Sequence, residues 1–243
     1  MMKKVAFTAL AAGLLMGADL QVGELKQHIE LGYLGTSGNS DSSSLHARYD
    51  NDYQWTRLTD LHFESDAFYA ESDGDKTDER YRAYGIVNHH FHENWYGYAE
   101  AGVLRNTFEG YEQQYNGGLG MGYVILDDKK QLWKVRGGYQ YRWANFTDGT
   151  DDDFHYLKLG TNYNYYFSDT NFLESELNFL EDLESADDFE TVFRIAVKVL
   201  MVESLSLRVG FEVKYDNTPA LNDDGTEKET TDTKTTVGIV YDF

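Results

Sequence analysis

The sequence predicts an all-β protein, a transmembrane antiparallel up-and-down β-barrel of about 12 strands. Three observations predict this fold class. Segments of about ten residues alternate apolar and polar side chains, short connections alternate with longer acidic ones, and the chain ends on an apolar strand that closes with Phe243. A tilted strand of about ten residues crosses a bilayer, and bacterial barrels combine an even strand number with short periplasmic turns and longer outer loops.

Residues 1–18 have the pattern of a secretory signal peptide. Lys3 and Lys4 precede an apolar region at 5–16, and small residues lie directly before Asp19. The apolar region is too short to be a transmembrane helix. We therefore expect residues 1–18 to be cleaved and residues 19–243 to form one barrel in a bacterial outer membrane.

Composition argues against several other classes of protein. The 42 acidic residues outnumber the 21 basic ones, and the net charge of −21 argues against nucleic acid as a partner. Aromatic residues make up 15% of the chain, whereas disordered acidic chains are poor in them. The chain has no cysteine, and after the signal peptide no apolar run is long enough to predict a membrane-spanning helix.

The strand signal is alternation at period two. It is clearest at 133–143, where Trp133 and Val135 share one face while Lys134 and Arg136 share the other. The same rule applied along the chain predicts strands at 26–36, 43–55, 59–71, 79–92, 95–106, 111–126, 131–145, 153–167, 171–183, 188–202, 204–216 and 230–243.

The connections between these segments alternate in length. With the N-terminus in the periplasm, the periplasmic connections are short: 56–58, 93–94, 127–130, 168–170 and 203. The outer connections are mostly longer and acidic: 36–42, 72–78, 146–152, 184–187 and 217–229. Two hypotheses fit these acidic loops, namely loose binding of divalent cations beside lipopolysaccharide and a simple solvated surface.

Aromatic residues fall at two levels when the strand direction alternates. The periplasmic level holds Tyr53, Trp55, Phe91, Trp95, Tyr123, Trp133, Tyr165, Phe167, Tyr241 and Phe243. The outer level holds Tyr33, Tyr69, Tyr81, Tyr115, Tyr141, Trp143, Phe179 and Tyr215. Two aromatic belts are typical of a barrel embedded in lipid and distinguish it from a soluble sandwich or a lipocalin-like barrel.

The last strand has the features of an assembly signal. Val237, Ile239, Tyr241 and Phe243 occupy every second position up to the C-terminus. Such an apolar strand is an aggregation hazard in water but is suited to a lipid-facing closing strand. We therefore predict that these residues are recognised by the barrel-assembly machinery and that outer-membrane lipid is the other partner.

Several motifs carry a family resemblance. They lie at 31–40 (LGYLGTSGNS), 81–85 (YRAYG), 94–96 (NWY), 99–101 (AEA), 107–110 (TFEG), 117–123 (GGLGMGY) and 137–139 (GGY). They resemble the salt-induced outer-membrane protein family, a family of Gram-negative bacteria whose domain has no assigned function. The resemblance implies an outer-membrane β-barrel of a Gram-negative bacterium and a link to salt stress, with no activity or functional residue to transfer.

The predicted inward face carries the most chemistry. It places acids on the first three strands and bases on the seventh to eleventh, and the candidates are Glu30, Asp50, Asp52, Glu64, Asp66, Lys134, Arg136, Arg142, Lys158, Arg194, Lys198, Arg208 and Lys214. Opposed walls of unlike charge fit either a narrow pore with a transverse field or a salt-bridged plug. We expect a narrow pore, or an envelope-stability protein linked to salt or osmotic conditions.

Two further readings stay open beside this one. Asp153 and His155 suggest a hydrolase at the outer rim, because a carboxylate and an imidazole together can polarise a water molecule. The third hypothesis is a structural or adhesive barrel that binds divalent cations through its acidic loops. His90 and His92 share a strand face, but no acid completes a metal site with them. We expect no catalytic residue, no cofactor and no resident metal.

Overall fold

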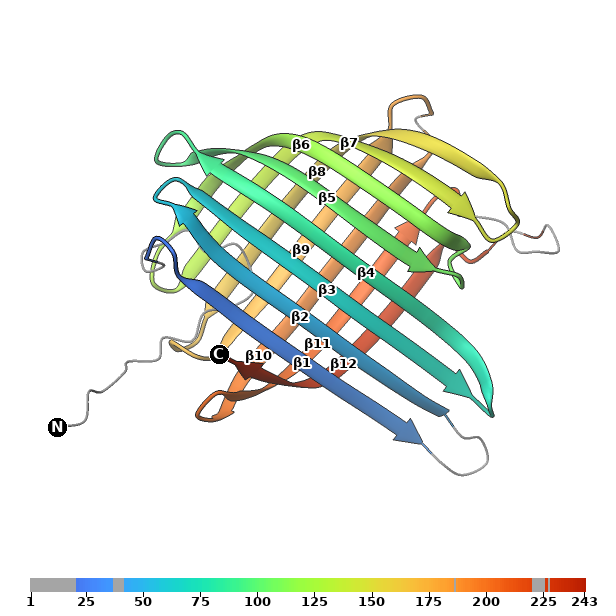
Figure 1. Ribbon diagram of the computed structural model, residues 1–243, viewed down its shortest axis with the longest axis horizontal. Helices are drawn as coiled ribbons and strands as arrows, with labels where there is room; N and C mark the ends of the chain where they lie inside the picture. Colours follow the sequence, from blue (N-terminus) through green and yellow to red (C-terminus); the bar gives the residue numbers. More distant parts are fainter. Residues whose placement is uncertain (1–20, 37–41, 186, 220–225, 227) are drawn as a thin grey trace.

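The computed structural model describes residues 21–36, 42–185, 187–219, 226 and 228–243. These form twelve antiparallel strands that close into one barrel, with β1 paired to both β2 and β12 (Figure 1). The predicted fold class is thus confirmed. The expected signal peptide at 1–18 lies outside the described residues.

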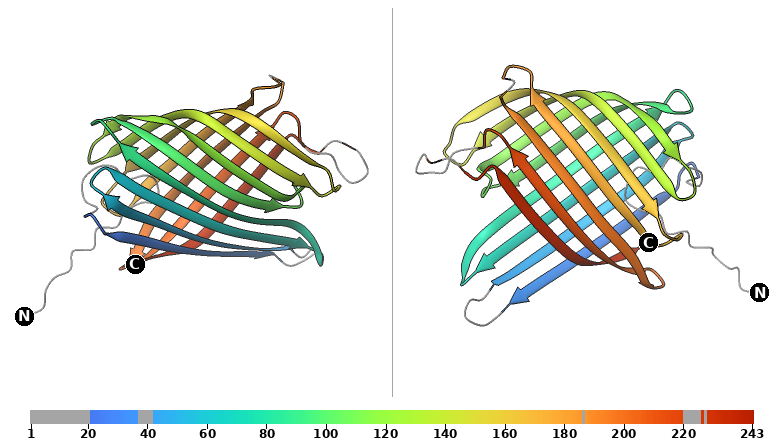
Figure 2. Two further views of the ribbon diagram at one scale, coloured as in Figure 1. Left: turned by 45° about the horizontal axis from the view of Figure 1, so that its top comes forward. Right: turned by 180° about the vertical axis from the view of Figure 1, so that it is seen from behind.

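The strands agree closely with the segments expected from the alternation. Their bounds are β1 Leu25–Thr36, β2 Ser42–Thr56, β3 Thr59–Ser72, β4 Asp75–His90, β5 Trp95–Asn106, β6 Tyr111–Asp127, β7 Gln131–Phe146, β8 Asp151–Tyr166, β9 Phe172–Asp182, β10 Phe189–Val202, β11 Leu205–Asp216 and β12 Thr231–Asp242. Figures 1 and 2 show β2–β5 on one broad wall of the barrel and β9–β11 on the opposite wall.

One expected outer loop is instead a tight turn. Ser72 pairs with Asp75, so only Asp73 and Gly74 connect β3 to β4, where a loop at 72–78 was expected. Both residues have positive φ, 52° and 87°. An Asp-Gly pair favours this two-residue hairpin turn, and it lets β4 begin four residues earlier than the alternation indicated.

The barrel is apolar outside and polar inside. Leu119 on the outward face is 64% exposed, whereas the inward Lys134 is 2% exposed. Successive side chains of a strand point to opposite faces, so the alternating sequence sends its two classes of side chain to the two sides of one wall. A soluble barrel would place them the other way round. The described residues contain no helix long and apolar enough to cross a membrane.

Outward aromatic side chains pack in pairs near both ends of the barrel. Trp95 and Tyr123 lie 4.9 Å apart at the end with the short turns, measured between ring centroids. Tyr115 and Trp143 stack at 5.7 Å toward the other end. These pairs join neighbouring strands at the two levels that the sequence predicted for aromatic residues.

Glycines of β6 and β7 make room for tyrosines inside the barrel. A Cβ placed on Gly122 would lie 2.1 Å from the ring of Tyr96, and one on Gly120 would lie 2.7 Å from the Tyr98 hydroxyl. Tyr96 and Tyr98 belong to an inward apolar cluster that also contains Ile86, Val124 and Leu132. The glycine-rich run in β6 therefore allows close packing against both β5 and β7, and the cluster fills part of the interior.

The barrel closes through a short seam between β1 and β12. His28–Leu31 pair in register with Asp242–Ile239, whereas β1 pairs with β2 along its whole length. Gly32 follows at a point where a Cβ would lie 2.3 Å from the Val237 carbonyl oxygen. Side chains reinforce the seam, since His28 Nδ1 lies 2.6 Å from Asp242 Oδ1.

Candidate functional site: the charged lumen

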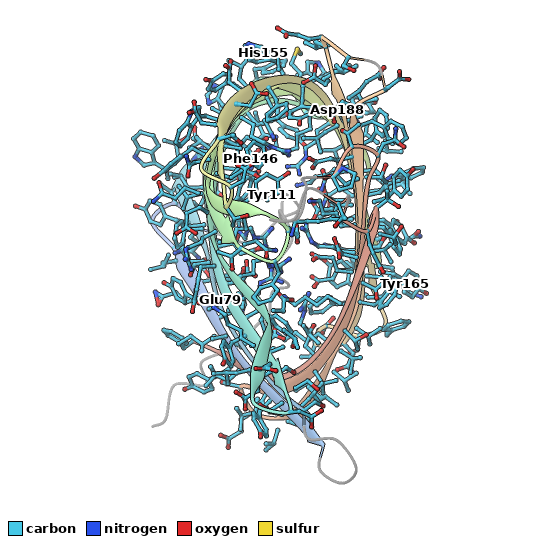
Figure 3. All side chains as sticks on the ribbon, turned by 90° about the vertical axis from the view of Figure 1, so that its right-hand side faces the viewer. Glu79, Tyr111, Phe146, His155, Tyr165 and Asp188 are labelled. Carbon is cyan, nitrogen blue, oxygen red and sulfur yellow. The ribbon has the colours of Figure 1, made fainter. Side chains whose placement is uncertain are left out.

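The inward candidates named from the sequence all lie inside the barrel. Buried ones are Glu30, Asp50, Asp52, Asp66, Lys134, Arg136, Arg142, Lys158 and Lys198. Half-buried ones are Glu64, Arg194, Arg208 and Lys214. Figure 3 looks along the barrel and shows side chains filling much of an elongated interior. The structure establishes that these residues lie inside the barrel. That they line a conducting path stays a prediction.

The charges are interleaved rather than segregated into an acidic and a basic wall. Beside the acids expected on the first three strands, β2 and β4 contribute the inward arginines Arg48, Arg80 and Arg82. On the wall expected to be basic, β9–β11 contribute the inward acids Glu174, Glu176, Glu190 and Glu212. The alternation that located the other candidates also places these residues inward, although they were not among the predicted residues.

A chain of ion pairs begins on the wall formed by β2–β4. Arg48 Nη2 donates to Glu64 at 2.7 Å, and Glu64 also accepts from Arg82. Arg82 Nε donates to Asp66 at 2.7 Å, and Asp66 accepts from Arg80 at 3.0 Å. Each carboxylate is therefore shared between two guanidinium groups.

Arg80 extends this series of ion pairs across the lumen. Its Nη1 donates to Glu212 of β11 at 2.8 Å. β4 and β11 are not neighbours, since β12, β1, β2 and β3 separate them around the closed sheet. The pair therefore joins opposite walls of the elongated barrel. Glu212 also accepts from Arg194 Nε, and Arg194 donates to Glu176 at 3.2 Å.

The series of ion pairs continues on the far wall and ends at Glu100 of β5. Arg136 Nη2 donates to Glu176 at 3.2 Å and its Nη1 lies 3.9 Å from Glu100. Lys158 donates to Glu100 as well. We call the whole set the central charge layer: Arg48, Glu64, Asp66, Arg80, Arg82, Glu100, Arg136, Lys158, Glu176, Arg194 and Glu212.

Space remains beside the central charge layer. A cavity of about 320 Å³ is lined by Arg48, Glu64, Arg82, Arg194 and Glu212 among others. Since a water molecule takes up about 30 Å³ of the liquid, the cavity has room for on the order of ten. The interior is thus a narrow, charged space with room for water rather than a fully packed core.

Further ion pairs link non-adjacent strands along the barrel. Arg142 of β7 donates to Glu190 of β10, and Lys198 of β10 donates to Asp242 of β12 at 2.6 Å. At the mouth, Lys214 of β11 reaches Glu109 in the β5–β6 connection at 2.7 Å. Nearly all the inward charges of the described chain thus have a partner of opposite sign within reach.

Four histidines also face the lumen, and each lies beside a carboxylate. The pairs are His28–Asp242 at 2.6 Å, His46–Glu30 at 3.6 Å, His62–Asp52 at 2.8 Å and His90–Asp60 at 3.4 Å. His92 is exposed beyond the end of β4, so it does not join His90 inside the barrel. His28, His46 and His62 were not predicted from the sequence, although each is an even number of positions from an inward acid on its own strand.

The suggested catalytic pair lies on the outside of the barrel. His155 Nε2 is 3.6 Å from Asp153, and the His155 ring lies between Tyr139 and Tyr141 at centroid distances of 5.9 and 5.4 Å. Figure 3 shows His155 on the outer surface, away from the lumen. The pair exists, but it belongs to the outward aromatic level and does not face the cavity.

The acids of the outer rim differ in their surroundings. Hydrogen bonds from the hydroxyl and amide of Thr150 lower the pKa of Asp148. Burial raises the pKa of Asp188, with nearby Glu190 and Asp182 acting in the same direction. The acidic stretch at 223–225 lies outside the described residues. Cation binding by the outer loops stays a hypothesis.

The C-terminal residues take the outward positions expected of them. Val237, Ile239 and Tyr241 share one face of β12, and Phe243 follows directly after the strand. The rings of Tyr241 and Phe243 stack with centroids 5.7 Å apart. Phe243 also exchanges two backbone hydrogen bonds with Gln27, each 3.1 Å long, so the last residue is tied to β1.

Solved structures with a similar fold are barrels of low sequence identity. The COG4313 outer membrane channel from Pseudomonas putida F1 has a TM-score of 0.54 and 14% identity, over 93% of this chain and 97% of that one. The translocator domain of the autotransporter NalP from Neisseria meningitidis has a TM-score of 0.53 and 11% identity, over 92% of this chain and 90% of that one. The NanC porin has a TM-score of 0.52 and 9% identity, over 90% of this chain and 99% of that one. These likenesses concern the fold alone.

Sequence comparison gives the family. No curated protein matches the chain. Residues 29–243, almost the whole barrel, match the family described as "Protein of unknown function, DUF481". Because the match covers every strand except the first few residues of β1, the chain belongs to this family.

Proposed function

We propose that the protein is a narrow channel of the Gram-negative outer membrane that passes ions and small solutes through a charge-lined lumen. The apolar exterior and the outward aromatic pairs support a place in lipid. Two barrels of similar fold are described as an outer membrane channel and a porin, which supports the choice among barrel functions.

One observation carries the proposal: the central charge layer encloses a cavity instead of packing solid. Rings of charged side chains set ion selectivity in narrow pores. Here both signs alternate around a space of about 320 Å³, so we expect small conductance and weak preference between cations and anions. The ion pair between Arg80 and Glu212 crosses this space and restricts it.

The same geometry supports a further proposal, that the channel responds to salt. The Debye length falls from about 10 Å at 0.1 M salt to about 3 Å at 1 M, and only charges that water reaches are screened strongly. Arg80, Glu212 and Arg194 line the cavity, which has room for water. We propose that higher ionic strength weakens the pair that crosses the lumen and so widens the path under osmotic stress.

A structural barrel that strengthens the envelope is the second candidate. It is favoured by the pairing of nearly all the inward charges, because a self-neutralised interior needs no solute. We propose no catalytic role for Asp153 and His155, since their outward position among aromatic side chains offers no enclosed site for a substrate.

Planar-bilayer recording separates the two candidates. The purified barrel should give small discrete conductance steps. A variant carrying Arg80→Gln together with Glu212→Gln keeps the net charge and should give larger steps, because the contact across the lumen is lost. Glu112→Gln, at an exposed pair with Arg105, is the matched control and should behave as wild type. A barrel that is folded and silent in every form would support the structural candidate instead.

A further inference from the structure

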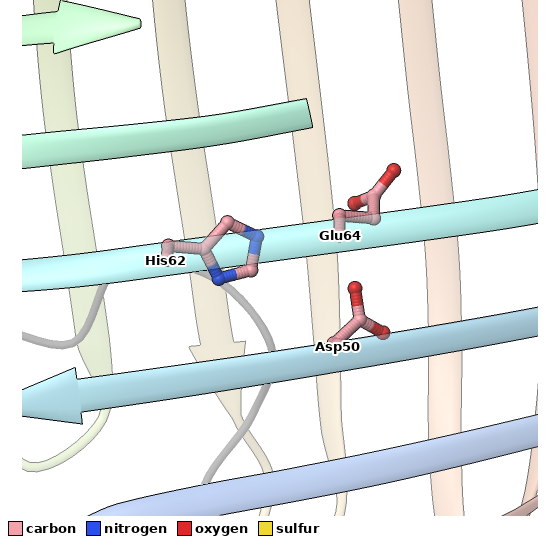
Figure 4. Close-up of side chains that lie close together, drawn as sticks. All are labelled: Asp50, His62 and Glu64. Atoms are coloured by element: carbon pink, nitrogen blue, oxygen red, sulfur yellow. The ribbon is translucent and has the colours of Figure 1, made fainter. Parts of the chain in front are cut away.

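Three side chains of metal-ligand type converge inside the lumen. Asp50 of β2 and His62 and Glu64 of β3 each offer one ligand atom, and these atoms all lie within 4.8 Å of one another (Figure 4). Asp50 and Glu64 are register partners, and His62 lies two positions before Glu64 on the same face. Among the described residues this is the only group of three or more such side chains so placed.

His62 is already oriented as a ligand. Its Nδ1 lies 2.8 Å from Asp52 Oδ1, and an ionised carboxylate accepts hydrogen bonds, so the ring proton belongs on Nδ1. The lone pair of the neutral ring is then on Nε2. Figure 4 shows a ring nitrogen on the side of Glu64 and Asp50. A carboxylate behind a histidine is the usual support of metal-binding imidazoles.

Arg48 binds two of these three side chains and has an alternative acceptor nearby. Its Nε donates to Asp50 at 3.0 Å and its Nη2 donates to Glu64 at 2.7 Å, so it neutralises the two carboxylates. Glu30 is the register partner of Arg48 on β1. Glu30 Oε1 is buried, and its nearest partner among the described residues, His46 Nδ1 at 3.6 Å, lies beyond hydrogen-bond distance. A guanidinium that leaves Asp50 and Glu64 therefore finds an unsatisfied acceptor on the adjacent strand.

We propose that Asp50, His62 and Glu64 bind one divalent transition-metal ion in the lumen, with Arg48 moving from these carboxylates to Glu30. One imidazole nitrogen with two carboxylates suits Zn²⁺, Mn²⁺ or Co²⁺, whereas Ca²⁺ and Mg²⁺ prefer oxygen alone. The ion reaches the site through the lumen, because His62 and Glu64 line the cavity of about 320 Å³. The inference concerns binding and holds whether or not the barrel conducts.

If Arg48 exchanges its partners when the metal binds, variants of the site should differ in metal affinity in a distinctive way. His62→Gln and Asp50→Asn remove ligands and should weaken binding at least tenfold. Asp52→Asn leaves the ligands in place but removes the support of His62, and such changes weaken metal binding by about 10–100-fold. Arg48→Gln removes the competing cation and should tighten binding, an effect that simple loss of structure does not produce.

The test is calorimetric titration of the chelator-treated, folded barrel with Zn²⁺, repeated with Co²⁺ to follow its visible absorption. We expect one saturable site and a Co²⁺ spectrum that disappears in His62→Gln. His90→Gln is the matched control, because His90 also faces the lumen beside a carboxylate, and it should leave binding unchanged. Heat-modifiable mobility in gels verifies folding of each variant. No saturable site, an equal loss in His90→Gln, or weaker binding in Arg48→Gln would overturn the proposal.

Discussion

Neutralising Glu212 should loosen the barrel across its lumen. Glu212 accepts from Arg80 of β4 and from Arg194 of β10, so Glu212→Gln removes the charge that holds guanidinium groups from opposite walls. Breaking a fully buried ion pair costs about 3–5 kcal/mol, because an unpaired charge is left behind, but the Arg80 and Glu212 side chains are 14% and 17% exposed. Both arginines keep a second acid, Asp66 at 3.0 Å and Glu176 at 3.2 Å. We therefore expect a loss of about 2 kcal/mol in the free energy of unfolding, below the full penalty.

Urea unfolding in lipid vesicles, followed by tryptophan fluorescence, measures this loss. Glu112→Gln is the control, because the Glu112 side chain is 44% exposed against 17% for Glu212 and pairs with an exposed arginine. An exposed pair contributes about 0–1 kcal/mol. In bilayers the extra positive charge of Glu212→Gln should also shift ion preference toward anions. Equal stability of the two variants would refute a structural role for the contact across the lumen.

Three further predictions test other parts of the account. Val197→Arg puts a charge on the outward face of β10 and should cost about 2–4 kcal/mol, seen as a lower folding yield in vesicles than Val197→Leu; equal yields would contradict the lipid-facing assignment. Gly122→Ala should destabilise by about 1–3 kcal/mol in urea, because its Cβ overlaps the Tyr96 ring, and a neutral effect would show that the ring moves freely. Ile29→Cys with Tyr241→Cys should form a disulfide on oxidation, since the two are register partners at the seam; absence of a cross-link in gels would argue against closure of β1 on β12.

Much of the fold follows from local pattern alone. Strand period, strand number and the outward C-terminal residues depend on alternation, which each strand expresses by itself. The start of β4 was misplaced although Asp73-Gly74 is a strong hairpin signal, because the acidic composition of 72–78 suggested a longer loop. Turn chemistry would have located that strand better than composition did.

The site was less accessible to sequence reasoning. Alternation assigns a residue to the lumen, but it does not say which residue of another strand it contacts. Arg80 contacts Glu212 across the lumen of the elongated barrel. Parity alone placed Asp50 and Glu64 inside. Their meeting with His62 depends on the register between β2 and β3, which the tight connection Thr56–Thr59 sets.

The dependence of conductance on salt tests the central claim most directly. In planar bilayers with KCl raised from about 0.1 M to about 1 M, the wild-type conductance should rise more steeply than the conductivity of the bulk solution, because screening weakens the Arg80–Glu212 pair. The variant with Arg80→Gln and Glu212→Gln should follow the bulk conductivity. Wild-type steps that scale with bulk conductivity as the variant does, or no steps at any salt concentration, would contradict the account.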